Sequence, residues 1–142
     1  MNDERSLRIL HLEGDSNDVN LISRALAGLD CEVHVVASRP EYANALEQDA
    51  YSMVLSDTGV PGFDGLSALE LVRQMGLHLP FLFVSGSHWD DRDVRALKLA
   101  GAADCVRKCD LDKLVPAIKR ALRENDGDPA AQAIRYARAM ER

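Results

Sequence analysis

The sequence lacks several features that would place it in a large functional class. It has no apolar run long enough to cross a membrane and no signal peptide at its start. Basic residues are not in excess, because 17 Lys and Arg stand against 23 Asp and Glu, and the net charge is −6. That balance argues against a nucleic-acid-binding surface. We therefore expect neither membrane insertion nor nucleic-acid binding from these residues.

Cysteine is also scarce. The three cysteines, Cys31, Cys105 and Cys109, do not have the spacing of metal ligands. An odd number without a secretion signal favours reduced thiols, so we expect a cytoplasmic protein whose cysteines are buried or half-buried. Four histidines are scattered over the predicted strands and loops, and we assign no chemistry to them: His11, His34, His78 and His88.

What the sequence does contain is a regular alternation of two periodicities. Its 142 residues, 46% of them hydrophobic, are enough for one domain with a substantial core. Short apolar runs typical of buried strands alternate five times with segments of helical spacing. The predicted strands cover residues 7–12, 31–37, 51–57, 79–85 and 103–107, and the predicted helices cover 19–29, 38–48, 66–75, 91–100 and 111–122.

This alternation predicts an α/β fold with helices on both faces of a parallel sheet. Right-handed crossovers favour the doubly wound strand order 2-1-3-4-5 at this chain length. We expect one domain over residues 6–124. Residues 125–142 are predicted to form a polar linker and an extra C-terminal helix, which would start at Asp128 and Pro129.

Carboxylates follow two of the predicted strands. Asp57 ends the third strand, just before a turn rich in glycine and proline, and an acidic loop over residues 13–18 follows the first strand. Ser16 and Asn17 in that loop are candidate helix caps. Strands one and three are neighbours in the predicted order, so the two acidic segments should meet at one sheet edge, where open α/β sheets place their chemistry.

Four motifs together resemble a known family. They are the acidic loop, Ser56-Asp57 with Pro61 and Asp64-Gly65, Ser85-Gly86 after strand four, and Lys108 after strand five. In this combination the chain resembles a response regulator receiver domain, the phosphoacceptor domain of two-component signalling. The resemblance covers residues 6–124 and implies a flavodoxin-like fold.

The resemblance implies a role for each motif. Asp57 would accept a phosphoryl group, Ser85 would hydrogen-bond that group and move toward it, and Lys108 would pair with its oxygens. Lys108 would thus make its main contact only after phosphorylation. Mg²⁺ would be held by Glu13, Asp15, Asp57 and the backbone carbonyl of Gly59.

The resemblance also implies the partners. The phosphoryl donor would be a sensor histidine kinase or a phosphotransfer protein, and the family also allows a homodimer. Self-catalysed phosphotransfer and slow hydrolysis would be the only chemistry, so we do not expect an enzyme in the usual sense. Output would come from a changed protein-contact surface.

The sequence departs from the family pattern at three positions. Gly14 stands where the family has the acid that ligates the metal directly. Cys105 replaces an aromatic switch residue, and Cys109 replaces a proline that commonly follows the lysine. The missing acid leaves open a degenerate receiver that serves as a phosphorylation-independent docking module.

Two other classes fit less well. A flavodoxin-like cofactor binder would place backbone donors and hydroxyls, rather than Glu13 and Asp15, after strand one. An aspartate-nucleophile phosphatase usually has a second aspartate two residues after its nucleophile. Gly59 occupies that position here and has no proton to give.

Overall fold

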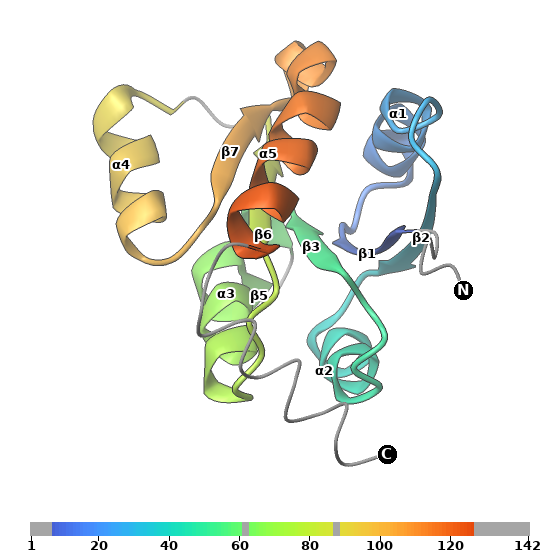
Figure 1. The fold of residues 1–142 in the computed structure, drawn as a ribbon, viewed down its shortest axis with the longest axis vertical. Helices are drawn as coiled ribbons and strands as arrows, with labels where there is room; N and C mark the ends of the chain where they lie inside the picture. The colour runs from blue at the N-terminus through green and yellow to red at the C-terminus, as the bar shows by residue number, and fades with distance from the viewer. Residues whose placement is uncertain (1–6, 61–62, 87–88, 127–142) are drawn as a thin grey trace.

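The computed structural model describes residues 7–60, 63–86 and 89–126. A five-stranded parallel sheet forms its centre, with strand order β2-β1-β3-β6-β7 (Figure 1). Counted by these five strands alone, this is the predicted order 2-1-3-4-5. The prediction of a doubly wound, flavodoxin-like α/β fold is therefore confirmed.

Strands and helices alternate along the chain as the periodicity predicts. The sheet consists of β1 (Leu7–Leu12), β2 (Cys31–Val36), β3 (Met53–Ser56), β6 (Phe81–Ser85) and β7 (Asp104–Arg107). The helices are α1 (Ser16–Ala25), α2 (Arg39–Glu47), α3 (Gly65–Gln74), α4 (Asp91–Leu99) and α5 (Leu114–Asp126).

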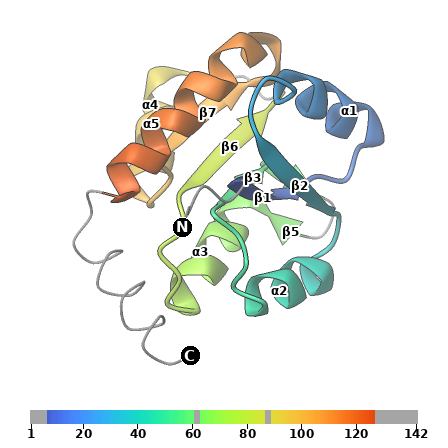
Figure 2. The same ribbon diagram turned by 45° about the vertical axis from the view of Figure 1, so that its right-hand side comes forward.

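Side chains that alternate along the strands build two separate cores. On β1, Ile9 belongs to the core under α1 and α5, whereas Leu10 and Leu12 belong to the core under α2 and α3. Figure 2 shows α1 and α5 on one side of the sheet and α2 and α3 on the other. Buried aromatic residues gather only in the second core, as far as the structure describes it: Tyr42, Tyr51, Phe81, Phe83 and Trp89.

Short polar side chains cap α1, α2, α3 and α4. Asp15 caps α1, with its carboxylate accepting from the amides of Asn17 and Asp18, so the predicted caps Ser16 and Asn17 are wrong. An aspartate one position earlier already satisfies the free amides of the first turn. Ser38 caps α2 in the same way, with its hydroxyl accepting from the amide of Glu41.

The structure contains two elements that the periodicity did not predict. A hairpin of two-residue strands, β4 (Gly59–Val60) and β5 (Phe63–Asp64), lies between Asp57 and α3. A 3₁₀ helix, η1 (Lys108–Lys113), precedes α5. Asp110 in η1 has φ −121° and ψ 40°, so the predicted single helix from residue 111 begins only at Leu114.

Helix α5 continues to Asp126, so Asn125 and Asp126 of the predicted polar linker are helical. The predicted C-terminal helix over residues 128–142 lies outside the described residues. None of the helices in the described part of the chain combines the length and apolar character that a membrane span requires.

Candidate functional site

The ends of β1 and β3 bring the acidic segments together. The amide of Asp57 donates to the carbonyl of Leu12 at 3.0 Å, and the amide of Glu13 donates to the carbonyl of Val36 at 3.0 Å. These bonds extend the sheet pairing by one residue at the carboxyl edge. They hold the acidic loop and Asp57 side by side, as the strand order predicts.

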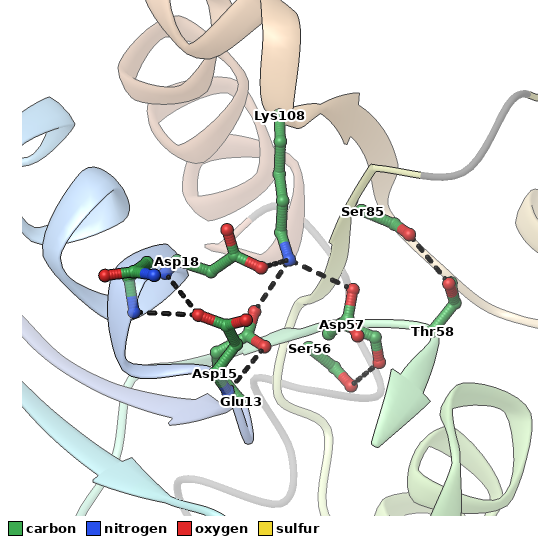
Figure 3. A network of polar contacts seen from close by, with 9 residues as sticks. Glu13, Asp15, Asp18, Ser56, Asp57, Thr58, Ser85 and Lys108 are labelled. Carbon is green, nitrogen blue, oxygen red and sulfur yellow. Dashed lines mark hydrogen bonds and ion pairs between the residues drawn. The ribbon is translucent and has the colours of Figure 1, made fainter. Parts of the chain in front are cut away.

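Lys108 links three carboxylates at this edge. Its Nζ lies 2.7 Å from Asp18 Oδ2, 2.9 Å from Glu13 Oε1 and 3.3 Å from Asp57 Oδ1 (Figure 3). The Lys108 side chain is 12% exposed and that of Glu13 only 3%. The expectation that Lys108 makes its main contact only after phosphorylation is therefore wrong, because its ammonium is already engaged in the unphosphorylated protein.

Burial and the neighbouring opposite charges shift the pKa values of Lys108 and Glu13 in opposite directions. Burial alone lowers the pKa of Lys108, but hydrogen bonds to Asp18 and Glu13 and the charge of Asp57 raise it above its ordinary value. Burial likewise raises the pKa of Glu13, and the hydrogen bond from Lys108 works against that rise. Each charge is tolerable at this edge because the opposite charge lies within hydrogen-bond distance.

His11 lies on β1 close to this network and is 1% exposed. Burial, followed by the charge of Lys108, lowers the pKa of His11 to about 4. Its Nε2 has no hydrogen-bond partner within the described chain. His11 is therefore neutral near pH 7 and adds no positive charge to the site.

Two hydroxyls meet on the other side of Asp57. Ser85 ends β6 and is 2% exposed, and its Oγ lies 2.8 Å from Thr58 Oγ1 (Figure 3). Ser56 is turned back onto the chain, with its hydroxyl donating to the carbonyl of Asp57 at 2.7 Å. The predicted site residue Ser85 thus lies at the same edge as Asp57, paired with a threonine.

Gly65 allows the turn after Asp57 to pack closely against β6. A Cβ on Gly65 would lie 2.5 Å from Cε1 of Phe83 and 3.1 Å from Cα of Thr58. Asp64 caps α3 by accepting from the amide of Ser67 at 2.8 Å. The Asp64-Gly65 motif therefore fixes where α3 starts relative to Asp57.

The acids of the loop after β1 have different partners in the structure. Glu13 lies within the Lys108 network, whereas Asp15 is engaged as the cap of α1. Asp18 joins the network, although sequence reasoning gave it no role. Its position in the first turn of a helix was a usable signal, because helical side chains point back toward the helix N-terminus and hence toward the end of β1.

The donor set suits the expected Mg²⁺ ion, although the carboxylates are arranged around an ammonium. Within the described residues, no three His, Cys, Asp or Glu side chains form a ready-made metal cage. Three carboxylates against one ammonium still leave two negative charges, all on hard oxygen donors. Mg²⁺ keeps several waters and needs only one or two carboxylates with a phosphate, so a complete protein cage is unnecessary.

The far end of the edge, by β7, is less filled. Cys105 is half-buried, and burial, followed by the charge of Asp104, raises its pKa to about 11. A hollow of about 470 Å³ lies beside it, bordered by residues that include Trp89 and Pro116. Arg107 donates to the carbonyl of Trp89 at 2.6 Å and so ties β7 to the segment before α4.

Comparison with known proteins identifies the family of this chain. The family model of the response regulator receiver domain matches residues 9–119. The DNA-binding transcriptional regulator NtrC of Escherichia coli (strain K12) is 30% identical over 112 residues, which are 78% of this chain and 24% of NtrC. Response regulator protein FleR of Pseudomonas aeruginosa is 41% identical over 63 residues, which are 44% of this chain and 13% of FleR.

Solved structures agree on the fold. A response regulator receiver domain protein from Clostridium thermocellum superposes with a TM-score of 0.74 at 21% identity, covering 84% of this chain and 97% of that one. At that identity the likeness shows the fold alone. The chain spans a quarter or less of the curated relatives NtrC and FleR. On the family match over most of its length, the chain belongs to the response regulator receiver domain family.

Proposed function

We propose that this chain accepts a phosphoryl group on Asp57 from a sensor histidine kinase or a phosphotransfer protein. The observation that carries the proposal is the position of Asp57. It lies at the carboxyl edge of the sheet, 3.3 Å from the Lys108 ammonium, and the Thr58–Ser85 hydroxyl pair lies beyond it (Figure 3). Its side chain is 15% exposed, so one face is open to a donor.

The chemistry is positioning and charge neutralisation. A carboxylate oxygen of Asp57 attacks phosphorus, and the bond from phosphorus to the donor imidazole nitrogen breaks with its electron pair leaving on the imidazole. Lys108 pairs with the arriving phosphoryl oxygens as a point charge. When bound, Mg²⁺ neutralises charge shared by the carboxylates and the phosphoryl oxygens. Glu13, Asp57 and the carbonyl of Gly59 would hold it.

Ser85 couples this event to the rest of the fold. In the unphosphorylated protein its hydroxyl pairs with Thr58. A phosphoryl group on Asp57 offers strong acceptor oxygens, so Ser85 exchanges Thr58 for that group and draws the end of β6 with it. The segment before α4 follows β6 directly, which makes α4 and β7 the surface that would change for a protein partner.

Intact-mass measurement after treatment with an acyl phosphate and Mg²⁺ tests the proposal. We expect one added phosphoryl group in the wild type and none in Asp57→Asn. Asp64→Asn is the matched control, because Asn also caps helices well and labelling should persist. Equal labelling of Asp57→Asn would refute the assignment. No labelling of the wild type would favour the phosphorylation-independent docking module.

We further propose that the chain acts in the cytoplasm, with self-catalysed transfer and hydrolysis as its only reactions. A homodimer is one way in which the α4 and β7 surface could be used. Size-exclusion chromatography with light scattering, before and after acyl phosphate treatment, tests that proposal. An unchanged mass would refute phosphorylation-driven dimerisation.

A further inference from the structure

The site has a carboxylate, Asp18, to which the motifs in the sequence assign no role. We infer that Asp18, not Asp15, supplies the metal-facing carboxylate that Gly14 cannot. This inference rests on the proposed function, because it names a ligand of the same site. It assigns to the first turn of α1 a task that the family gives to the loop before it.

The path of the chain brings Asp18 to the site. Helix α1 begins four residues after β1 ends, and Asp18 lies in its first turn. Helical side chains point toward the helix N-terminus, here back toward the carboxyl edge of the sheet. Asp18 Oδ2 therefore reaches the same Lys108 nitrogen as Glu13 and Asp57, at the shortest of the three distances, 2.7 Å (Figure 3).

Asp15 is used elsewhere. Its Oδ1 accepts from the amide of Asn17 at 2.8 Å and from that of Asp18 at 3.2 Å. Turning this carboxylate toward a metal would remove the cap of α1. Asp15 instead helps Asp18 indirectly, because the cap fixes the first helical turn from which Asp18 projects.

Charge and exposure fit a hydrated cation. The Lys108 ammonium occupies the point where the three carboxylates converge, and these four side chains together carry a net charge of −2. Asp18 is the most exposed of the three, with 28% of its side chain accessible against 15% for Asp57 and 3% for Glu13. An ion that keeps several waters would therefore meet Asp18 on the open side of the site.

Calorimetric titration of the full chain with Mg²⁺ tests the inference. Asp18→Asn should weaken Mg²⁺ binding by at least about tenfold, because loss of even a ligand-orienting partner usually costs that much. Asp15→Asn is the matched control in the same loop and should stay within about twofold of the wild type, since Asn also caps helices. The reverse ranking would overturn the inference.

A second pair of variants separates direct ligation from an effect through Lys108. In a Lys108→Met background, Asp18→Asn should still weaken Mg²⁺ binding if Asp18 is a ligand. If Asp18 only holds Lys108 in place, its effect disappears there and the inference fails. Should the double variant not fold, a crystal of the wild type soaked in Mg²⁺ decides, because an Asp18 oxygen must lie about 2.1 Å from the metal if Asp18 is a ligand and must remain on Lys108 if it is not.

The last part of the Mg²⁺ titration restores an acid at position 14, where the family has one. Gly14→Asp in the Asp18→Asn chain should recover Mg²⁺ affinity, since Gly14 is not among the described glycines with positive φ and its backbone conformation is therefore open to aspartate. No recovery would count against the inference.

Phosphorylation is measured separately. A wild type that is not labelled on Asp57 refutes the proposed function, yet the ligand assignment stands if Asp18→Asn still weakens Mg²⁺ binding. A labelled wild type whose Asp18→Asn variant binds Mg²⁺ normally refutes this inference alone.

Discussion

The two halves of the sheet's carboxyl edge are built on different principles. The ionic half consists of Glu13, Asp18 and Asp57, which follow β1 and β3, and of Lys108, which follows β7 and reaches them with contacts of 2.7–3.3 Å. The hydroxyl half consists of Thr58, which lies just after Asp57, and of four residues in or after β6 and in β7: Ser85, Trp89, Cys105 and Arg107. Its contacts include the Thr58–Ser85 hydroxyl pair and the bond from Arg107 to the carbonyl of Trp89, and a hollow of about 470 Å³ lies beside Cys105.

The neighbouring helices show the same difference. Helix α3 buries four residues, whereas α4 buries none completely and only Val94 and Leu97 pack partly against the core. Helix α4 therefore has less packing to lose than α3 if it moves. Under the proposed function, the ionic half would receive the charge and α4 would be the element that shifts.

The largest effect should come from breaking the ionic half. Lys108→Met removes the one ammonium and leaves three carboxylates facing one another, so we expect a loss of about 3 kcal/mol in the free energy of unfolding in chelator. Added Mg²⁺ should recover part of it, because a cation then replaces the ammonium. Urea denaturation measures this, with the exposed Lys119→Met as the control. Equal stability of both variants would show that Lys108 is not the counter-charge of the site.

The second test concerns how the stability of the ionic half depends on pH through His11, which lies beside it. The folded pKa of His11, about 4, lies below its ordinary value of 6.5, so His11 contributes stability that is complete above pH 6.5. That contribution disappears as the pH falls from 6.5 toward 4 and is on the order of 2–3 kcal/mol. The facing charges are Lys108, Asp57 and Asp18.

His11→Leu removes this contribution and should flatten the stability profile between pH 6.5 and 4. It should also remove the desolvation cost of the buried His11 Nε2, which has no hydrogen-bond partner within the described chain. Urea titrations of both proteins in chelator, compared at each pH, isolate His11 from Glu13. A difference between the two proteins that is independent of pH would contradict the assignment.

The third test breaks the boundary between the halves. Gly65→Ala places a methyl group against Phe83 and the backbone of Thr58, so we expect a loss of about 1–3 kcal/mol. Gly28→Ala is the matched control, because nothing lies within 4 Å of its added Cβ. Thermal melts compare the two variants. A melting temperature for Gly65→Ala equal to that of Gly28→Ala would mean that the turn adapts freely.

The smallest effect should come from filling the hydroxyl half. Cys105→Phe puts a ring beside the hollow, so we expect a change in stability below about 1 kcal/mol. Ala102→Phe, at a 6% exposed position in the aromatic core just before β7, should cost more, since overpacking a filled core costs about 1–3 kcal/mol. Similar melting temperatures for both variants would show that the two positions are equally packed.

The sequence predicted the fold, and the meeting of the acidic loop with Asp57 at one sheet edge, for physical reasons. Buried strands such as Met53–Ser56 are marked by apolar residues, and strand order then places Asp57 next to the β1 loop. The hairpin of β4 and β5 was missed because two-residue strands carry no periodicity. Asp18 was missed because its place in the first turn of α1 indicates only the direction of its side chain, whereas its partner Lys108 lies 90 positions away along the chain.

That separation along the chain has a consequence for folding. Glu13 and Asp18 cannot pair with Lys108 until β7 has joined the sheet, because this shared partner lies 90–95 positions later in the chain. Contacts of such long sequence separation form late, since loop closure opposes them until most of the chain is organised. Loss of the Asp18–Lys108 pair should therefore accelerate unfolding and leave the refolding rate nearly unchanged.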